Sequence, residues 1–206
     1  MRDETVIAEI SQCLPDAVDE LLQVALDALH DLHDGIIAGS EKSALTARHR
    51  YDAVVWKLNG GSFFGCEAGE GAAVIVRRHC AAIPGNVPMW GQSGEFLIEQ
   101  AGTRAVVSFS CGLSRMLASL SFHAVDPHVP FISPTGYRSE FRSYQLGKSV
   151  AEVATGILRD QLSSGPVWME EKYRARVSAD QWHWLDAESI PVVPPHDPAG
   201  QFMLAL

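Results

Sequence analysis

The fold is decided by one stretch, residues 95–125, which reads EFLIEQAGTRAVVSFSCGLSRMLASLSFHAV. Apolar and polar side chains alternate in three parts of it, as they do in strands that bury one face. Turn-like residues, Ala101-Gly102-Thr103 and Cys111-Gly112, separate the three parts. We therefore predict a three-stranded antiparallel meander with one apolar face and one mixed polar face. The apolar positions are Phe96, Ile98, Ala105, Val107, Phe109, Leu120, Phe122 and Ala124.

Helices are predicted on both sides of this stretch. Apolar side chains recur at helical spacing after Pro15, which suits a first helical turn, and Gly35 is a plausible end. Ser40 can cap a second helix, which Asn59-Gly60-Gly61 ends. The short connection predicts an antiparallel helical hairpin whose acidic and basic faces complement each other. A further helix is expected over 148–162, and a second C-terminal helix can occupy 167–185.

The chain of 206 residues has the length of one domain. We expect a single α+β domain over 1–206, in which an N-terminal helical hairpin packs with the meander and one or two C-terminal helices. Its parts are the helical hairpin at 1–58, a loop-rich sheet region at 59–145, and C-terminal helices and a tail at 146–206. The tail contains a proline-rich segment, 191–195, that we expect to be extended.

Charge is distributed unevenly along the chain. The formal net charge is −9, and residues 1–34 contain nine acids and one base, while the remaining residues contain 16 acids and 15 bases. An acidic balance gains nothing from phosphate neutralisation, so it disfavours a nucleic-acid partner while leaving that class open. An acidic helix instead fits a basic protein partner, although a solvated face explains the same residues. The candidate contacts are Asp16, Asp19, Glu20, Asp27, Asp31 and Asp34.

The sequence lacks the features of export and of membrane insertion. No apolar run approaches the ~20 residues of a membrane span, and no apolar signal-peptide core follows Met1. The four cysteines form no C-x-x-C pair, so we expect reduced thiols and a cytoplasmic location. No cofactor motif is present, and we predict no cofactor.

Two sets of residues have the chemistry of metal ligands. One set lies on a single face of the first hairpin helix, and the sequence leaves open whether this face binds metal. It contains Asp27, His30, Asp31 and Asp34. The other is interpreted as buried thiols beside a histidine, and contains Cys66, His79 and Cys80. Neither set has the spacing of a known site, so no metal site is predicted.

The end of the third predicted strand carries candidate catalytic residues. His123, Asp126 and His128 lie within six residues, where a strand passes into a loop. A strand exit with Asp-Pro turn chemistry explains them equally well. The mixed polar face also holds serines near His123, but no G-x-S-x-G elbow exposes a nucleophile.

The next loop has the composition of an anion-binding site. Hydroxyls, a glycine and two guanidinium groups can hold a phosphate or a carboxylate, although a structured turn explains them too. The candidate residues are Thr135, Gly136, Tyr137, Arg138 and Arg142.

A second glycine-bearing loop, 59–66, presents Asn59, Phe63 and Phe64 as candidate partner contacts. The stretches Tyr51–Cys66 and Phe131–Phe141 together resemble accessory proteins carried on bacterial plasmids and integrative elements. The resemblance covers about a third of the chain. It implies an element that must persist in a host cell or defend itself against it, and it brings no catalytic residues.

These observations favour a non-enzymatic interaction or regulatory protein of a mobile element, which binds a host or element-encoded protein. The binding surface is then either the acidic helix or the two glycine-bearing loops, which we expect to meet at one rim of the sheet. The alternative is a small enzyme for a phosphoester-like substrate. In it, His123, Asp126 and His128 perform acid–base chemistry while Arg138 and Arg142 hold the anion. The sequence leaves open whether the protein is an enzyme.

Overall fold

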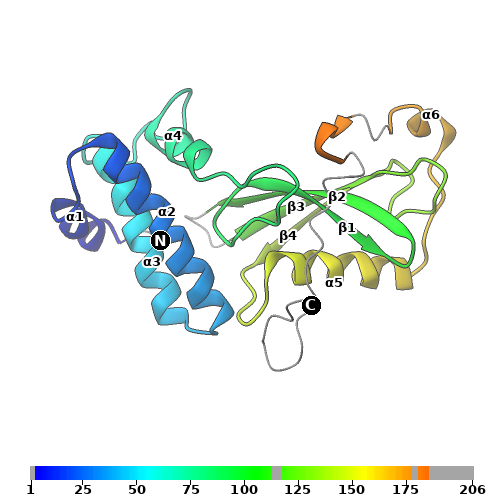
Figure 1. The fold of residues 1–206 in the computed structure, drawn as a ribbon, viewed down its shortest axis with the longest axis horizontal. Helices are drawn as coiled ribbons and strands as arrows, with labels where there is room; N and C mark the ends of the chain where they lie inside the picture. Colours follow the sequence, from blue (N-terminus) through cyan, green and yellow to red (C-terminus); the bar gives the residue numbers. More distant parts are fainter. Residues whose placement is uncertain (1–2, 113–116, 178–180, 186–206) are drawn as a thin grey trace, which may run out of the picture.

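A computed structural model describes residues 3–112, 117–177 and 181–185 of the chain. Its centre is one four-stranded antiparallel sheet in the order β1-β2-β3-β4 (Figure 1). The strands are β1 (Gly94–Gln100), β2 (Thr103–Gly112), β3 (Leu117–Ala124) and β4 (Tyr137–Ser143). The longer helices are α1 (Glu4–Gln12), α2 (Val18–Ile37), α3 (Glu41–Leu58), α4 (Ala72–His79) and α5 (Val150–Ser163). Two short elements follow, α6 (Glu171–Arg174) and a 3-10 helix at His183–Leu185.

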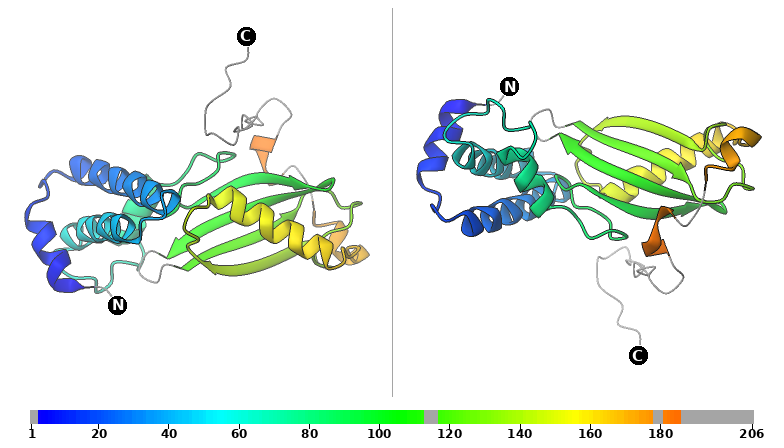
Figure 2. Two further views of the ribbon diagram at one scale, coloured as in Figure 1. Left: turned by 90° about the horizontal axis from the view of Figure 1, so that it is seen from below. Right: turned by 90° about the horizontal axis from the view of Figure 1, so that it is seen from above.

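The helices form two groups around the sheet, which confirms the predicted α+β class. Helices α1 to α4 gather at one end of the sheet, and α5 lies across one of its faces (Figures 1 and 2). One hydrophobic cluster contains side chains from both groups and from the sheet, among them Leu29, Phe96 and Leu158. On the opposite face, Trp182 packs with Val106 in a small separate cluster.

The register of the strands explains why the sheet has four strands where three were expected. Strand β3 alternates between buried and half-exposed positions, as predicted. In β4, Arg138 pairs with Phe122 and Glu140 pairs with Leu120, so charged side chains occupy positions that face the helix. Charged residues that point inward are typical of an edge strand, and they remove the apolar alternation that marks a strand in a sequence. The expected loop at 137–142 is therefore a strand.

Helices α2 and α3 form the predicted antiparallel hairpin, lying side by side in all three views (Figures 1 and 2). Ser40 caps α3, since its Oγ accepts a hydrogen bond from the amide of Ser43 at 3.3 Å. Gly35 does not end α2 as expected. It is buried two residues before the end of the helix, where a Cβ atom would lie 2.8 Å from the backbone nitrogen of Ala44. The turn is made by Gly39, whose φ is 70°.

The helical group is joined to the sheet through Trp90, which is fully buried. Its backbone N–H donates to Nδ1 of His33 on α2 at 3.2 Å, and its indole Nε1 donates to the carbonyl of Lys148 at 2.6 Å. Its ring also contacts Phe109 of β2 and Tyr144, at centroid distances of 5.7 and 5.1 Å. Trp90 therefore contacts α2 through its backbone, and the sheet and the segment before α5 through its side chain.

The C-terminal region is helical only in part. Helix α5 confirms the helix expected over 148–162, and it begins with a capping box formed by Ser149 and Glu152. The range 167–185 contains α6 and the 3-10 helix where a longer helix was considered. The proline-rich segment 191–195 lies outside the described residues. Within the described ranges, no helix is long and apolar enough to cross a bilayer.

The contact between α2 and α3 can be tested with a pair of helical glycines. Gly35→Ala should lower the free energy of unfolding by about 1–3 kcal/mol, because the added methyl group meets backbone atoms that cannot yield. Gly156→Ala in α5 is the control, since its Cβ would meet only Arg159 Nη2 at 3.8 Å. It should raise the free energy by up to about 1 kcal/mol through helix propensity. Urea unfolding measures both, and equal stabilisation would contradict the close approach.

The bond between His33 and Trp90 predicts a pH dependence of stability. Burial lowers the pKa of His33 below its usual 6.5, and a proton on Nδ1 would also break this bond. The folded state therefore binds this proton less readily than the unfolded state does. Stability should be fully present above pH 6.5 and should fall as the pH falls through that value.

The measurement is urea unfolding between neutral and mildly acidic pH. His33→Asn, which keeps an acceptor near Nδ1 but does not titrate, should reduce the pH dependence. The exposed His128 is the control, and His128→Asn should leave the dependence unchanged. Burial also lowers the pKa of His123, so part of the dependence should remain in both variants. An unchanged pH profile for His33→Asn would contradict the assignment.

Candidate functional site

Helix α4 presents a basic surface beside the helical hairpin. Its inner face buries Ala72, Ala73 and Val76 in the core. Three consecutive basic residues, Arg77, Arg78 and His79, form its last turn, where positive charge also interacts favourably with the helix dipole. The Arg77 and Arg78 side chains are 42% and 66% exposed, so both guanidinium groups are accessible to a ligand.

Two carboxylates from the preceding loop pair with these arginines. Glu67 forms an ion pair with Arg77, and Glu70 accepts a hydrogen bond from Arg78 Nη2 at 2.9 Å. This bond holds the pKa of Glu70 below its ordinary value and raises that of Arg78. Because both pairs are exposed to solvent, each stabilises the fold only weakly. An incoming anion can therefore replace either carboxylate at small cost.

The loop between α3 and α4, residues 59–71, exposes one aromatic side chain to solvent. The Asn59 side-chain amide donates to the carbonyls of Ser62 and Phe64, at 2.8 and 3.0 Å, and Ser62 Oγ accepts from the Phe64 amide at 2.9 Å. Phe63 packs edge-on against Trp56, with ring centroids 5.1 Å apart. Phe64 points the other way and is 94% exposed. We call Phe64, Glu67, Glu70 and the basic residues 77–79 together the α4 surface.

The charges of the helical group are segregated. Residues 6–79 contain eleven acids and six bases, but all six bases lie in 41–79, together with only four of the acids. The other seven acids lie at or before residue 34, mainly on α2. Helix α3 contributes little accessible charge from its second half, because residues 51–55 are all buried. The densest exposed positive charge of this group is thus the end of α4.

Sequence reasoning missed this surface although a signal was present. The run Arg77-Arg78-His79 lies in a segment, 72–80, whose short apolar run fits a helix and a buried strand equally well. The overall charge of −9 then drew attention to the acidic helix. Residues 41–79 alone contain six bases and four acids, and this local positive charge indicates a basic surface that includes α4.

The acidic residues nominated on α2 and just before it are exposed, and several have partners within the chain. Asp16 pairs with Lys57 at 2.7 Å, and Asp31 pairs with Arg50 at 3.4 Å. Asp27 accepts a hydrogen bond from Gln23. Asp19, Glu20 and Asp34 complete the exposed set. Within the described ranges, no three histidine, cysteine or acidic side chains are placed to hold a metal ion, on this face or elsewhere.

The candidate catalytic residues are engaged separately. His123 is half-buried between Tyr137 and Trp182, with ring centroids 5.1 and 5.9 Å away. Asp126 accepts two hydrogen bonds from Arg104, at 2.9 and 2.6 Å, which lower the pKa of Asp126. His128 is exposed on the following turn. Ser108 Oγ donates to Glu95 at 2.7 Å and lies 3.5 Å from His123 Nε2, so the carboxylate contacts the serine and not the histidine.

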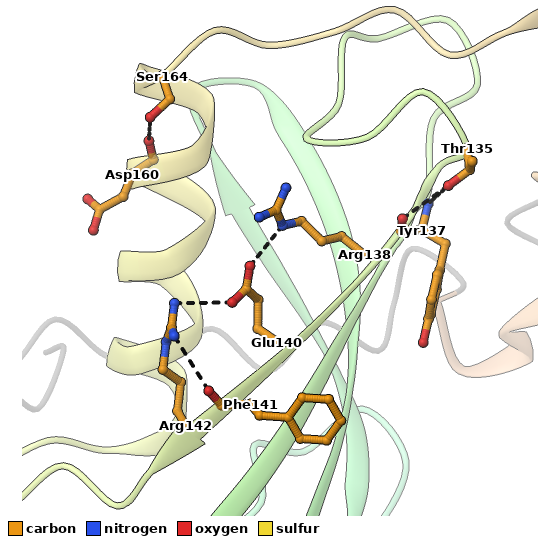
Figure 3. Close-up of polar contacts among 8 residues, drawn as sticks. All are labelled: Thr135, Tyr137, Arg138, Glu140, Phe141, Arg142, Asp160 and Ser164. Atoms are coloured by element: carbon orange, nitrogen blue, oxygen red, sulfur yellow. Dashed lines mark hydrogen bonds and ion pairs between the residues drawn. The ribbon is translucent and has the colours of Figure 1, made fainter.

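The two nominated arginines hold a carboxylate of their own strand. Arg138 Nε and Arg142 Nη2 contact the two carboxylate oxygens of Glu140, at 2.8 and 3.1 Å (Figure 3). They face α5, whereas Tyr137 and Phe141 project from the other side of β4. Because His123 pairs with Tyr137 in the register, it lies on the face opposite the arginines. The sheet thus separates His123 from the proposed anion clamp.

The other candidate anion-binding residues, at 135–137, belong to a structured turn that leads into β4. Thr135 Oγ1 accepts from the amide of Tyr137 and donates to its carbonyl, at 3.3 and 3.1 Å. Gly136 has a φ of 72°, and a Cβ there would lie 2.7 Å from Met169 Sδ.

The expected meeting of the two glycine-bearing loops is wrong. Residues 59–66 connect α3 to α4 at one end of the molecule. Residues 133–136 lie at the other end beside α6, where the Glu170 amide donates to the carbonyl of Pro134 (Figure 1).

Comparison with known proteins assigns both halves of the chain to one kind of protein. Residues 6–79 match a family model described as the KlcB N-terminal DNA-binding domain, and residues 93–184 match one described as the KlcB third domain. Protein KlcB of Escherichia coli is 44% identical over 175 residues, which cover 83% of this chain. The chain is homologous to the KlcB proteins. A second KlcB from Escherichia coli is 42% identical over 174 residues, or 84% of this chain.

This chain spans less than half the length of these KlcB relatives, 44% of one and 38% of the other. No solved structure matches it at a significant level. The expected likeness to plasmid-borne proteins is confirmed in its coarse form, because KlcB is plasmid-associated. It extends over most of the chain and not only over a third.

The KlcB match overturns the expected function and partner. A non-enzymatic protein that binds a protein partner, with nucleic acid disfavoured, was expected from the acidic helix. The matching N-terminal model is described as DNA-binding, and the match includes both α2 and α4. The error arose because a net charge averages over surfaces that face different directions. The alternative, a phosphoester-acting enzyme, has no support from the comparisons, and its residues lie on two faces of the sheet.

Proposed function

We propose that this chain binds double-stranded DNA through the α4 surface. The observation that carries the proposal is the exposed run Arg77-Arg78-His79, inside the segment that matches the KlcB N-terminal DNA-binding domain. Guanidinium groups bind phosphate oxygens strongly, and neutralised phosphates release counterions that drive association. A protein that binds DNA acts in the cytoplasm of a bacterial cell, so the proposal agrees with the expected location.

The charges of the helical group favour α4 as the contact. The acidic residues of α2 repel the DNA backbone, whereas the basic end of α4 attracts it. The buried second half of α3 cannot enter a groove, and it acts as the support on which α4 packs through Val76. Phosphate contacts of this kind position a protein on DNA without reading its sequence.

Arg78→Ala should weaken binding to duplex DNA of mixed sequence. Loss of one phosphate contact should reduce the slope of log affinity against log salt by about 1. Arg159→Ala on α5 is the matched control, because Arg159 is also exposed, at 62% against 66%, and also lies beside a carboxylate. Fluorescence anisotropy with a labelled duplex of about 30 base pairs, between about 50 and 200 mM salt, measures both.

Two outcomes contradict the proposal. Equal weakening by Arg78→Ala and Arg159→Ala would show that overall charge, and not α4, controls binding. Absence of any DNA binding at the lowest salt would contradict the proposed DNA-binding function.

Removal of the loop carboxylates should have the opposite effect. Glu67→Gln and Glu70→Gln abolish negative charges that compete with phosphate for Arg77 and Arg78. Each should tighten binding by about two- to fivefold, which corresponds to the energy of an exposed ion pair. Glu171→Gln at the other end of the molecule is the control and should have little effect. Unchanged or weaker binding by both loop variants would exclude phosphate at these arginines.

A further inference from the structure

Phe64 is a large apolar side chain held in water. It is 94% exposed, whereas the neighbouring Phe63 packs against Trp56. Single exposed apolar residues are common on proteins, so exposure alone decides nothing. The loop that carries Phe64, however, is built to hold it outward.

Three hydrogen bonds and several glycines fix this loop. The Asn59 amide bonds the carbonyls of Ser62 and Phe64, and Ser62 Oγ bonds the amide of Phe64. Gly60, Gly61 and Gly65 adopt φ values of 72°, 83° and 75°, which other residues rarely adopt. The backbone at Phe64 is therefore fixed before any ligand arrives, so little backbone entropy remains to be lost on binding.

The charges beside Phe64 indicate which ligand suits it. Glu67, three residues further along the same loop, pairs with Arg77, so the loop that carries Phe64 is attached to the basic end of α4. A protein partner would need to cover both an apolar loop tip and the two adjacent arginines of α4. Duplex DNA offers both matching parts, phosphates for the arginines and stacked bases for the ring.

We propose that Phe64 inserts between two base pairs of the bound duplex and kinks it. This inference rests on the proposed function, and it adds a contact with the bases to the phosphate contacts of α4. Apolar wedges of this type unstack one base step and bend DNA by about 20–90°. Flexible pyrimidine–purine steps are deformed most easily, so they should be the preferred sites.

The test uses the full chain and a duplex of about 30 base pairs with a central TA step, labelled at both ends for energy transfer. A 2-aminopurine at that step reports unstacking. The wild-type protein should increase both the energy transfer and the 2-aminopurine fluorescence. Phe64→Ala should lose most of both signals but keep the salt dependence of binding, because the arginines remain. Phe64→Leu, which keeps an apolar wedge, should retain part of the signals.

Controls separate this idea from the proposed function and from misfolding. Ile83→Ala removes another exposed apolar side chain, 70% exposed and outside the α4 surface, and should keep both signals. Thermal unfolding of Phe64→Ala should match that of the wild type, because so little of the ring is buried.

Three results would overturn the wedge. Wild-type protein that binds without either signal is one, and equal bending by Phe64→Ala is the second. The third is tighter binding to single strands that depends on Phe64, since this would indicate stacking on unpaired bases. Absence of all DNA binding would instead be the failure of the proposed function.

Discussion

The arrangement of this protein depends on the burial of Trp90. Trp90 lies between α2, the segment that leads into α5 and the sheet. Its backbone N–H donates to His33 Nδ1, and its indole N–H donates to the Lys148 carbonyl. A backbone bond from Gly147 to the Ile36 carbonyl, at 2.8 Å, closes the same junction from the other side. A buried indole must satisfy its N–H, so these bonds fix an orientation as well as a contact. The two matched KlcB regions are thereby held together across residues 80–92.

Once the helical group is fixed in this way, its charges point in defined directions. The acids concentrate on α2 and the exposed arginines at the end of α4, so a chain with a net charge of −9 still presents a basic surface. Electrostatic attraction falls off over about 10 Å at moderate salt, so local charge matters more than the total. Acidic residues elsewhere can then restrict the orientation of a nucleic acid without preventing its approach.

The two arginine pairs of the chain illustrate how similar residues acquire different roles. Arg138 and Arg142 share Glu140, which is only 14% exposed, so their charge is used within the sheet. Arg77 and Arg78 have carboxylate partners that are 58% and 71% exposed. Water weakens the second set of pairs, and an external anion can exchange with it. Whether an arginine pair stabilises the fold or can bind an external anion therefore depends on how deeply its carboxylate partner is buried.

The sequence by itself determined the α+β class, the hairpin, the meander and α5, because periodic burial and helix caps are local patterns. It did not reveal β4, whose inward positions are charged, or the use of Gly35 as a contact between helices. Only the tertiary structure decided the site. It placed the two glycine-bearing loops at opposite ends, turned His123 and Arg138 to opposite faces, and brought Glu67 beside Arg77. Such proximities depend on how elements pack across the whole chain, and no local pattern encodes them.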